Sequence, residues 1–259
     1  LYMSRYYYLA TSLPPIEFPN LPDTSFIALK EGLRLNLSDS DFKKVAALQL
    51  FTDISNIRPL LLEEEIDSRG NLSEKELDEA LLIKDFLPDY VFDFLDKYDS
   101  LSDKLRHFSE LISMFFQHEL AEQSGFLKNY FSFEKEWRLV VLALRAKSSG
   151  RDVTKELQFE DFSDPLVSSI LAQKDSEQFE PPLEYKDLKD KFLSCGKDPW
   201  QQHKMLAEYR FQKIEEIMTN SQFSIDYILA YMAQLMIVEY WNELDEQRGM
   251  VILDTFKSS

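Results

Sequence analysis

Two glutamates near the end of the chain have the residue type and spacing that acid–base chemistry requires. Glu239 and Glu243 lie four residues apart, one helical turn, at the edge of an apolar stripe. Two carboxylates in such a setting can divide acid and base roles, because one of them holds its proton more tightly. A hydrolase could use this pair. The alternatives are an ion pair with Arg138, Arg145 or Arg210, and plain solvation at the surface.

The segment from residue 65 to residue 76 has part of the spacing of a calcium-binding EF-hand loop. Its candidate oxygen ligands, counted with Gly70 at the sixth position, are Glu65, Asp67, Asn71 and Glu76. Arg69 places a cation at the fifth position, where an oxygen ligand belongs. The same segment contains a capping box that begins at Ser73 and opens a helix without any metal. We expect the helix start and keep the calcium loop as a weak alternative.

Other residue patterns that carry chemistry are missing from the sequence. It has no Gly-rich phosphate loop, no nucleophile elbow and no Cys/His spacing typical of a metal site. His107 and His118 are eleven residues apart, whereas two metal ligands on one helix are normally three or four apart. We therefore predict a protein that is not an enzyme, with no catalytic residue, no cofactor and no metal.

Two of the arginines that could pair with carboxylates lie on one predicted helix, which runs from Phe133 to about Lys147. Its apolar residues recur at the spacing of a broad helical face, Phe133, Trp137, Leu139, Val140, Val141, Leu142 and Leu144. Arg138 and Arg145 are seven residues apart and project from nearly the same side. Lys147 falls in the last turn, where a cation suits the helix dipole. These cations form either a solvated rim or a row that anchors carboxylates from elsewhere.

Predicted helices account for most of the chain, so the expected fold class is all-α. Only 6 of the 259 residues are glycine, which leaves few tight β-turns. Capping residues begin several helices, at Ser38 or Ser40, Ser73, Ser102, Ser224 and Asp198 with Pro199. The first of these helices is expected to end near Ile54, with a break between Asn56 and Pro59.

Changes in composition along the chain predict three segments. Residues 1–150 form an N-terminal helical lobe that contains the arginine-bearing helix. Residues 151–199 are a mixed, half-polar connector that suits a hinge between two lobes. Residues 200–259 form a long helical hairpin that packs on the first lobe.

Charge and cysteine content limit the classes of partner and the compartment. A net charge of −17 disfavours nucleic acid, which demands clustered Lys and Arg, and an anionic lipid surface would repel the chain. A basic protein partner suits this field better. Cys195 is the single cysteine, so no internal disulfide can form and a reducing compartment is expected. Without a visible signal peptide or a run long enough to cross a bilayer, the predicted location is cytoplasmic.

Three stretches carry a resemblance to a known family, RYYYLATSLPP, EWRLVVLALRAKSSGRD and YILAYMAQLMIVEYWNELDEQRG. Together they resemble an uncharacterised bacterial family that is encoded among the subunits of V/A-type ATPases. A fainter similarity links that family to the C-type subunit of these rotary machines (the d-type subunit in eukaryotes). The C-type subunit repeats helical units with an acidic residue, an Asn-Leu pair and Arg-x-Lys before a small residue. Glu136, Arg145 and Lys147 follow this outline, whereas Leu139 stands where asparagine is expected.

The resemblance implies a non-catalytic part of the central stalk. The C-type subunit is a helical funnel that rests on the membrane rotor ring and receives the rotating shaft, so the expected fold is two packed lobes in a similar funnel-like arrangement. The expected partners are the other ATPase subunits, with the protein at the cytoplasmic face of the membrane when assembled. Candidate interaction or ion-pair residues are Arg138, Arg145, Lys147, Glu136, Trp137, Glu239, Trp241 and Glu243. The alternatives are an assembly or regulatory adaptor of the same ATPase and, third, a helical enzyme that uses the paired carboxylates.

Overall fold

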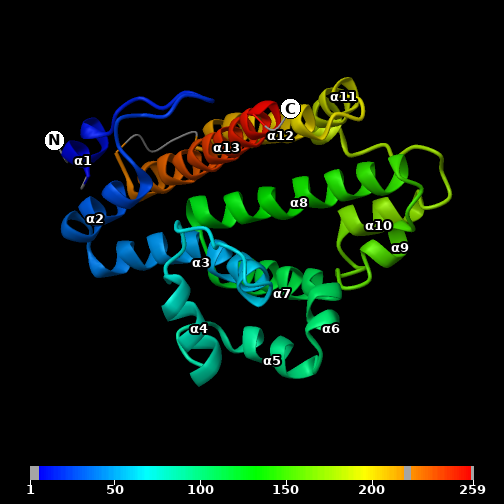
Figure 1. Cartoon of the computed structure of the whole chain (residues 1–259), viewed down its shortest axis with the longest axis horizontal. Helices are drawn as coiled ribbons and strands as arrows, with labels where there is room; N and C mark the ends of the chain where they lie inside the picture. Colours follow the sequence, from blue (N-terminus) through cyan, green and yellow to red (C-terminus); the bar gives the residue numbers. More distant parts are fainter. Residues whose placement is uncertain (1–5, 219–222, 258–259) are drawn as a thin grey trace. The chain divides into compact units, whose positions relative to one another are not determined.

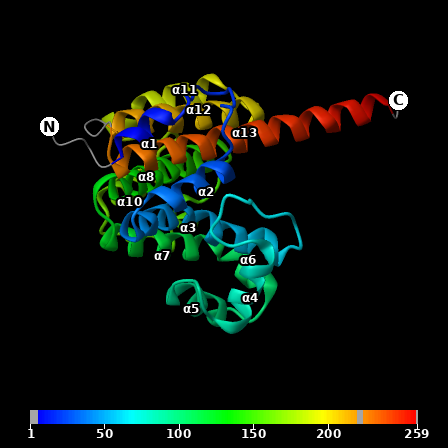
Figure 2. The same ribbon diagram turned by 90° about the vertical axis from the view of Figure 1, so that its left-hand side faces the viewer.

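Helices make up most of the structure, a computed structural model that describes residues 6–218 and 223–257, with side chains described as far as Arg248 (Figures 1 and 2). No strand occurs within these ranges, where Glu17 and Asn20 form an isolated bridge. The all-α prediction is therefore confirmed. In the same ranges no helix combines the length and the apolar composition that a bilayer span requires.

Several helices begin where the sequence predicted a cap. The Ser73 side chain accepts a hydrogen bond from the Glu76 N–H, and the Glu76 carboxylate accepts one from the Ser73 N–H at 2.8 Å, which completes the capping box of α4 (Glu74–Ile83). The Asp198 side chain caps α12 (Pro199–Ile217) by accepting the N–H groups of Trp200 and Gln201, with proline in the first turn. Local side-chain chemistry thus decides these helix starts.

The predicted break before Pro59 is wrong, because α3 runs from Asp39 to Leu61 with this proline inside its last turns. Proline removes one backbone N–H, so the bond that would close on the turn before it is lost. The helix continues because the Leu62 N–H donates to the Arg58 carbonyl at 3.2 Å. A positive φ of 57° at Glu63 then turns the chain away.

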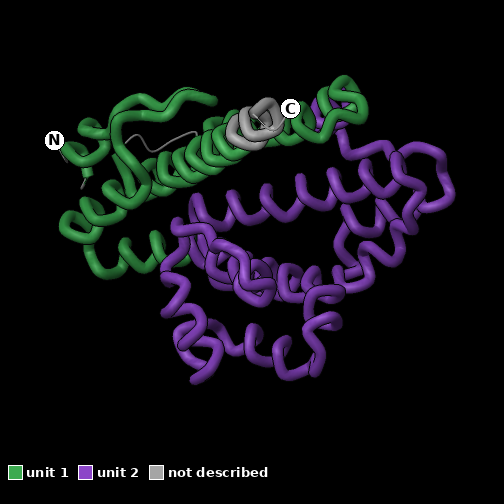
Figure 3. Tube along the Cα trace, viewed as in Figure 1, with its two compact units in different colours: residues 1–48, 191–259 green, residues 49–190 purple. Residues whose placement is uncertain are grey.

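The chain divides into two compact units that differ from the three predicted segments (Figure 3). The first unit contains residues 1–48 and 191–259, and the second contains residues 49–190. Residues 151–190, predicted as part of a connector, belong to the same unit as the arginine-bearing helix. Their helices pack on that helix, which explains the different division.

The first unit is built around the hairpin of α12 and α13 (Ile225–Lys257), which pack against each other. Its other helices are α1 (Tyr7–Ser12), α2 (Phe26–Asn36), the start of α3 and the end of α11 (Lys186–Ser194). Trp241 is buried here, with its ring centroid 4.5 Å from that of Trp200 and 6.0 Å from that of Phe18. This aromatic cluster joins α12, α13 and the loop before α2.

The second unit is organised around α8 (Gly125–Ser148), which buries residues on more than one side, as predicted. The other elements are the rest of α3, α4, α5 (Asp89–Lys97), α6 (Leu101–Arg106), α7 (Phe108–Glu122), α9 (Val153–Glu156), α10 (Pro165–Ala172), the 3-10 turn η1 (Leu183–Tyr185) and the start of α11. Helix α7 packs on α8 and on α5. Rings of Phe51, Phe115 and Phe131 meet in its core, with Phe115 5.1 Å from Phe51 and 5.3 Å from Phe131.

Candidate functional site

Arg138 on α8 forms an internal ion pair with a carboxylate from the segment that follows α9. Its Nη2 donates to Oε1 of Glu160 at 3.0 Å, and the Glu160 side chain is only 6% exposed. The Ser113 hydroxyl donates to the other carboxylate oxygen at 3.2 Å, and the guanidinium also lies over the Phe116 ring. Burial lowers the pKa of Arg138, although the charge and hydrogen bond of Glu160 act in the opposite direction. Arg138 thus binds a carboxylate of its own unit.

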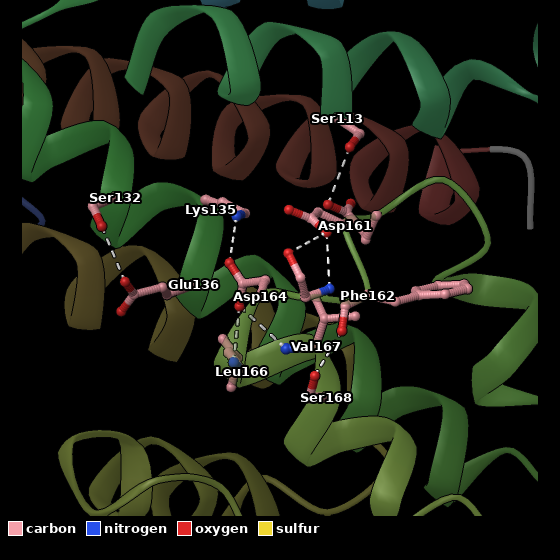
Figure 4. A network of polar contacts seen from close by, with 12 residues as sticks. Ser113, Ser132, Lys135, Glu136, Asp161, Phe162, Asp164, Leu166, Val167 and Ser168 are labelled. Carbon is pink, nitrogen blue, oxygen red and sulfur yellow. Dashed lines mark hydrogen bonds and ion pairs between the residues drawn. The ribbon is translucent and has the colours of Figure 1, made fainter. Parts of the chain in front are cut away.

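Lys135 makes a second tie from α8 to the same segment. Its ammonium donates to Oδ2 of Asp164 at 2.7 Å, while the other oxygen of that carboxylate accepts the Leu166 N–H at 2.8 Å (Figure 4). Asp164 therefore both caps α10 and forms an ion pair with Lys135 on α8. Burial alone would raise the pKa of Asp164, but the Lys135 ammonium and the backbone N–H groups outweigh it, so this pKa lies below its usual range.

Glu136 and Trp137 are also used inside the unit. The carboxylate of Glu136 accepts hydrogen bonds from the Ser132 hydroxyl at 3.0 Å and from the Tyr185 hydroxyl at 2.7 Å, which holds the 3-10 turn against α8. The Trp137 indole N–H donates to Oε2 of Glu134 at 2.8 Å.

Lys147 contacts the C-terminal end of α10. Its ammonium donates to the backbone carbonyls of Gln173, Lys174 and Ser176 at 2.6 to 2.7 Å. The last carbonyls of a helix lack partners within the helix and carry partial negative charge, so a cation is well suited to them. Gln173 is the C-cap residue of α10, and Lys174 and Ser176 follow it, so Lys147 binds the C-terminal end of α10 and the turn after it.

Replacing Lys147 with methionine is expected to loosen the end of α10, because three carbonyls lose a charged donor while the aliphatic stem keeps its packing. We expect a loss of about 1–3 kcal/mol in the free energy of unfolding, measured by urea denaturation. Amide exchange should speed up around Ser176. The matched control is Lys128→Met on the exposed side of the same helix, and equal losses in the two variants would contradict the capping role.

Arg145 differs from the other cations of α8. Its side chain is exposed and makes no hydrogen bond or ion pair with any residue within the described ranges. Partial withdrawal from water and the nearby charge of Arg151 lower the pKa of Arg145. Arg151 itself pairs with Glu156 at 2.6 Å. Two seemingly equivalent arginines on one helix thus have different surroundings, one internal and one open to solvent.

The two carboxylates of the predicted α13 pair lie in different surroundings. Glu239 Oε1 accepts the backbone N–H of Phe26 at 2.6 Å, so it caps the start of α2 from a neighbouring helix. Glu243 is exposed. A cavity of about 530 Å³ in the same unit, between residues 10–16 and helices α12 and α13, is lined by neither of them. Among the described residues that line it, Glu215 is the single carboxylate.

Two residues of the calcium hypothesis, Asp67 and Asn71, belong to a network that binds a loop to α3, whereas Glu65 is exposed. Asp53 Oδ1 accepts the N–H groups of Asn71 at 2.7 Å and Leu72 at 3.0 Å, and its Oδ2 accepts the Asn71 side-chain amide at 2.7 Å. Asp67 pairs with Arg69 at 2.8 Å. Glu76 serves the capping box.

Within the described residues no group of His, Cys, Asp and Glu could hold a metal ion. Gly70 is required by close packing, since a Cβ at this position would lie 2.4 Å from Oδ1 of Asp53. An EF-hand needs its glycine for a sharp turn, but here the same glycine makes room for a carboxylate.

Sequence reasoning missed the partners of the α8 cations and the polar residues of α3. Asp164 precedes proline, and this Asp-Pro signal for a helix start could have identified it as a cap. Gln49, Asp53 and Asn56 share one face of α3 and are all buried, a spacing visible in the sequence. Glu160 has no such signal.

Comparison with known proteins identifies relatives over nearly the full chain. A family model described as "Protein of unknown function (DUF2764)" matches residues 3–258. Uncharacterised proteins of Chlamydia muridarum and Chlamydia trachomatis serovar D are each 29% identical over 258 residues, which is 97% of both chains. An uncharacterised protein of Chlamydia pneumoniae is 33% identical with the same coverage. No solved structure matches the chain.

Proposed function

The chain belongs to the DUF2764 family, and we propose that it is a non-catalytic component of the central stalk of a bacterial V/A-type ATPase, similar to the C-type subunit. In this role it couples the rotor ring to the shaft through protein contacts, at the cytoplasmic face of the membrane. The resemblance of the stretch from Glu136 to Lys147 to the helical units of the C-type subunit motivates the assignment. The all-α fold is compatible with it.

The observation that carries the proposal is the contrast between Arg145 and its neighbours on α8. Lys135, Arg138 and Lys147 direct their charges to groups within their own unit. Such ion pairs and hydrogen bonds stiffen a helical scaffold, and a component that transmits torque needs a stiff scaffold. Arg145 is exposed and free of such ties within the described residues, so its charge is available to a partner.

The charge-reversing variant Arg145→Glu is expected to weaken association with the other ATPase subunits at least tenfold, because a carboxylate at this position repels the acidic group that the arginine served. The free energy of unfolding should change by no more than about 0.5 kcal/mol, as for exposed positions in general. Tagged protein would be purified from native membranes, and the bound chains identified and quantified. The control is Lys128→Glu, an equal change of charge at an exposed position on the same helix.

The same purification distinguishes the competing functions. A stalk component co-purifies with the assembled motor in constant stoichiometry. An assembly or regulatory adaptor is recovered only with partly assembled complexes, at less than one copy per motor. Recovery of no ATPase subunit by the unaltered protein would overturn the proposal, and turnover of a substrate by the isolated protein would favour an enzyme.

A further inference from the structure

The corner between α4 and α5 exposes three large apolar side chains within five consecutive residues. Leu82 is 82% exposed, Ile83 52% and Phe86 70%. Helices α4 and α5 lie on the side of α7 away from α8 (Figures 1 and 2). Single exposed apolar residues are ordinary, but a cluster of this size is typical of an interaction site.

The backbone of this corner holds Phe86 in a conformation that a phenylalanine rarely adopts. Lys84 has a φ of 55° and Phe86 a φ of 65°, both in the left-handed region. A bulky side chain at positive φ is a true outlier, and strain of this kind concentrates at sites of function. On either side of Phe86, Leu87 is buried and the Lys84 ammonium pairs with Asp96 on α5 at 2.6 Å.

The surroundings of the apolar cluster are strongly acidic. Residues 74–99 contain nine Asp and Glu against three Lys. Lys84 is paired with Asp96, and Lys97 donates to Glu110 at 2.6 Å. The potential at this corner is therefore negative, and it would be complemented by a positively charged partner.

We propose that the α4–α5 corner, defined by Leu82, Ile83, Phe86 and the acidic side chains of residues 74–99, docks a basic amphipathic helix of a partner protein. The apolar face of such a helix covers the three exposed side chains, and its Lys and Arg residues meet the surrounding carboxylates. A second copy of this chain is disfavoured because it presents the same negative field, and an anionic bilayer is repelled for the same reason. The inference does not depend on the ATPase assignment.

The test uses a fluorescein-labelled synthetic helix with leucine on one face and lysine on the other, and a counterpart with glutamate in place of lysine. Anisotropy should report binding of the lysine peptide alone. The double variant Leu82→Ser/Phe86→Gly should weaken that binding at least tenfold, since hot-spot side chains carry most of the affinity. Leu35→Ser is the matched control, because Leu35 is an equally exposed leucine on α2, at 86%.

Phe86→Gly alone should raise the melting temperature while it weakens binding, because glycine adopts a φ of 65° without strain. This readout separates a lost contact from a lost fold. No binding of the lysine peptide, equal binding of both peptides, or equal weakening by Leu35→Ser overturns the proposal. Self-association that disappears in the double variant also overturns it, because the occupant would then be a second copy.

Discussion

Replacing Asp53 with alanine is expected to lower the free energy of unfolding by about 3–5 kcal/mol. The Asp53 side chain accepts three hydrogen bonds from the loop at Asn71 and Leu72, and the residue is only 1% exposed. Alanine leaves these part-buried donors without their acceptor, and each unsatisfied group costs about 1–3 kcal/mol. Urea denaturation followed by circular dichroism measures the effect.

Two companion variants of Asp53 make this test specific. Asp78→Ala removes an exposed carboxylate from α4, and its effect should stay within about 0.5 kcal/mol. Asp53→Asn keeps the shape of the side chain but places an amide N–H group opposite the Asn71 amide. The loss in the free energy of unfolding should therefore lie between those of Asp78→Ala and Asp53→Ala. If Asp53→Ala were no more harmful than Asp78→Ala, the network would not stabilise the loop.

Replacing Arg138 with leucine is expected to cost about 3–5 kcal/mol, because it leaves a buried carboxylate without its cation. Glu160 is 6% exposed, and in this variant its carboxylate would retain the hydrogen bond from the Ser113 hydroxyl but lose the ion pair. The double variant Arg138→Leu/Glu160→Gln should recover part of the loss, since a neutral amide is easier to bury than a charge. The coupling between the two changes follows from a double-mutant cycle measured by urea denaturation.

An exposed ion pair provides the comparison for Arg138. Arg151 pairs with Glu156, and the two side chains are 50% and 29% exposed. Arg151→Leu should therefore cost no more than about 1 kcal/mol, as exposed pairs generally do. Equal losses for Arg138→Leu and Arg151→Leu would show that burial of Glu160 does not matter to stability.

Local signals made much of the fold predictable. The all-α class, the capping box at Ser73, the Asp198-Pro199 start and the broad apolar face of α8 all depend on residues within a few positions of one another. The break near Pro59 was mispredicted because proline removes one N–H but does not forbid a helix whose later donors find acceptors.

The site was predictable only in part, because its partners are distant in sequence. Glu160 and Asp164 lie 22 and 29 residues from Arg138 and Lys135. No spacing rule connects such residues. Glu239 and Glu243 have the four-residue spacing of a carboxylate pair, yet Glu239 accepts a hydrogen bond from Phe26, 213 residues away in the sequence, at the start of α2.

Residue order alone indicates that the chain folds into helices and where many of them start. Helical periodicity and capping act over one or two turns, so they can be read directly from residue order. Tertiary structure alone decided that Arg138 is internal and Arg145 exposed, that the calcium-like loop binds to Asp53, and that Phe86 stands in solvent. The physical reason is that burial and the choice of a charge partner depend on which distant segment packs on each helix face, and the spacing within a single helix does not contain that information.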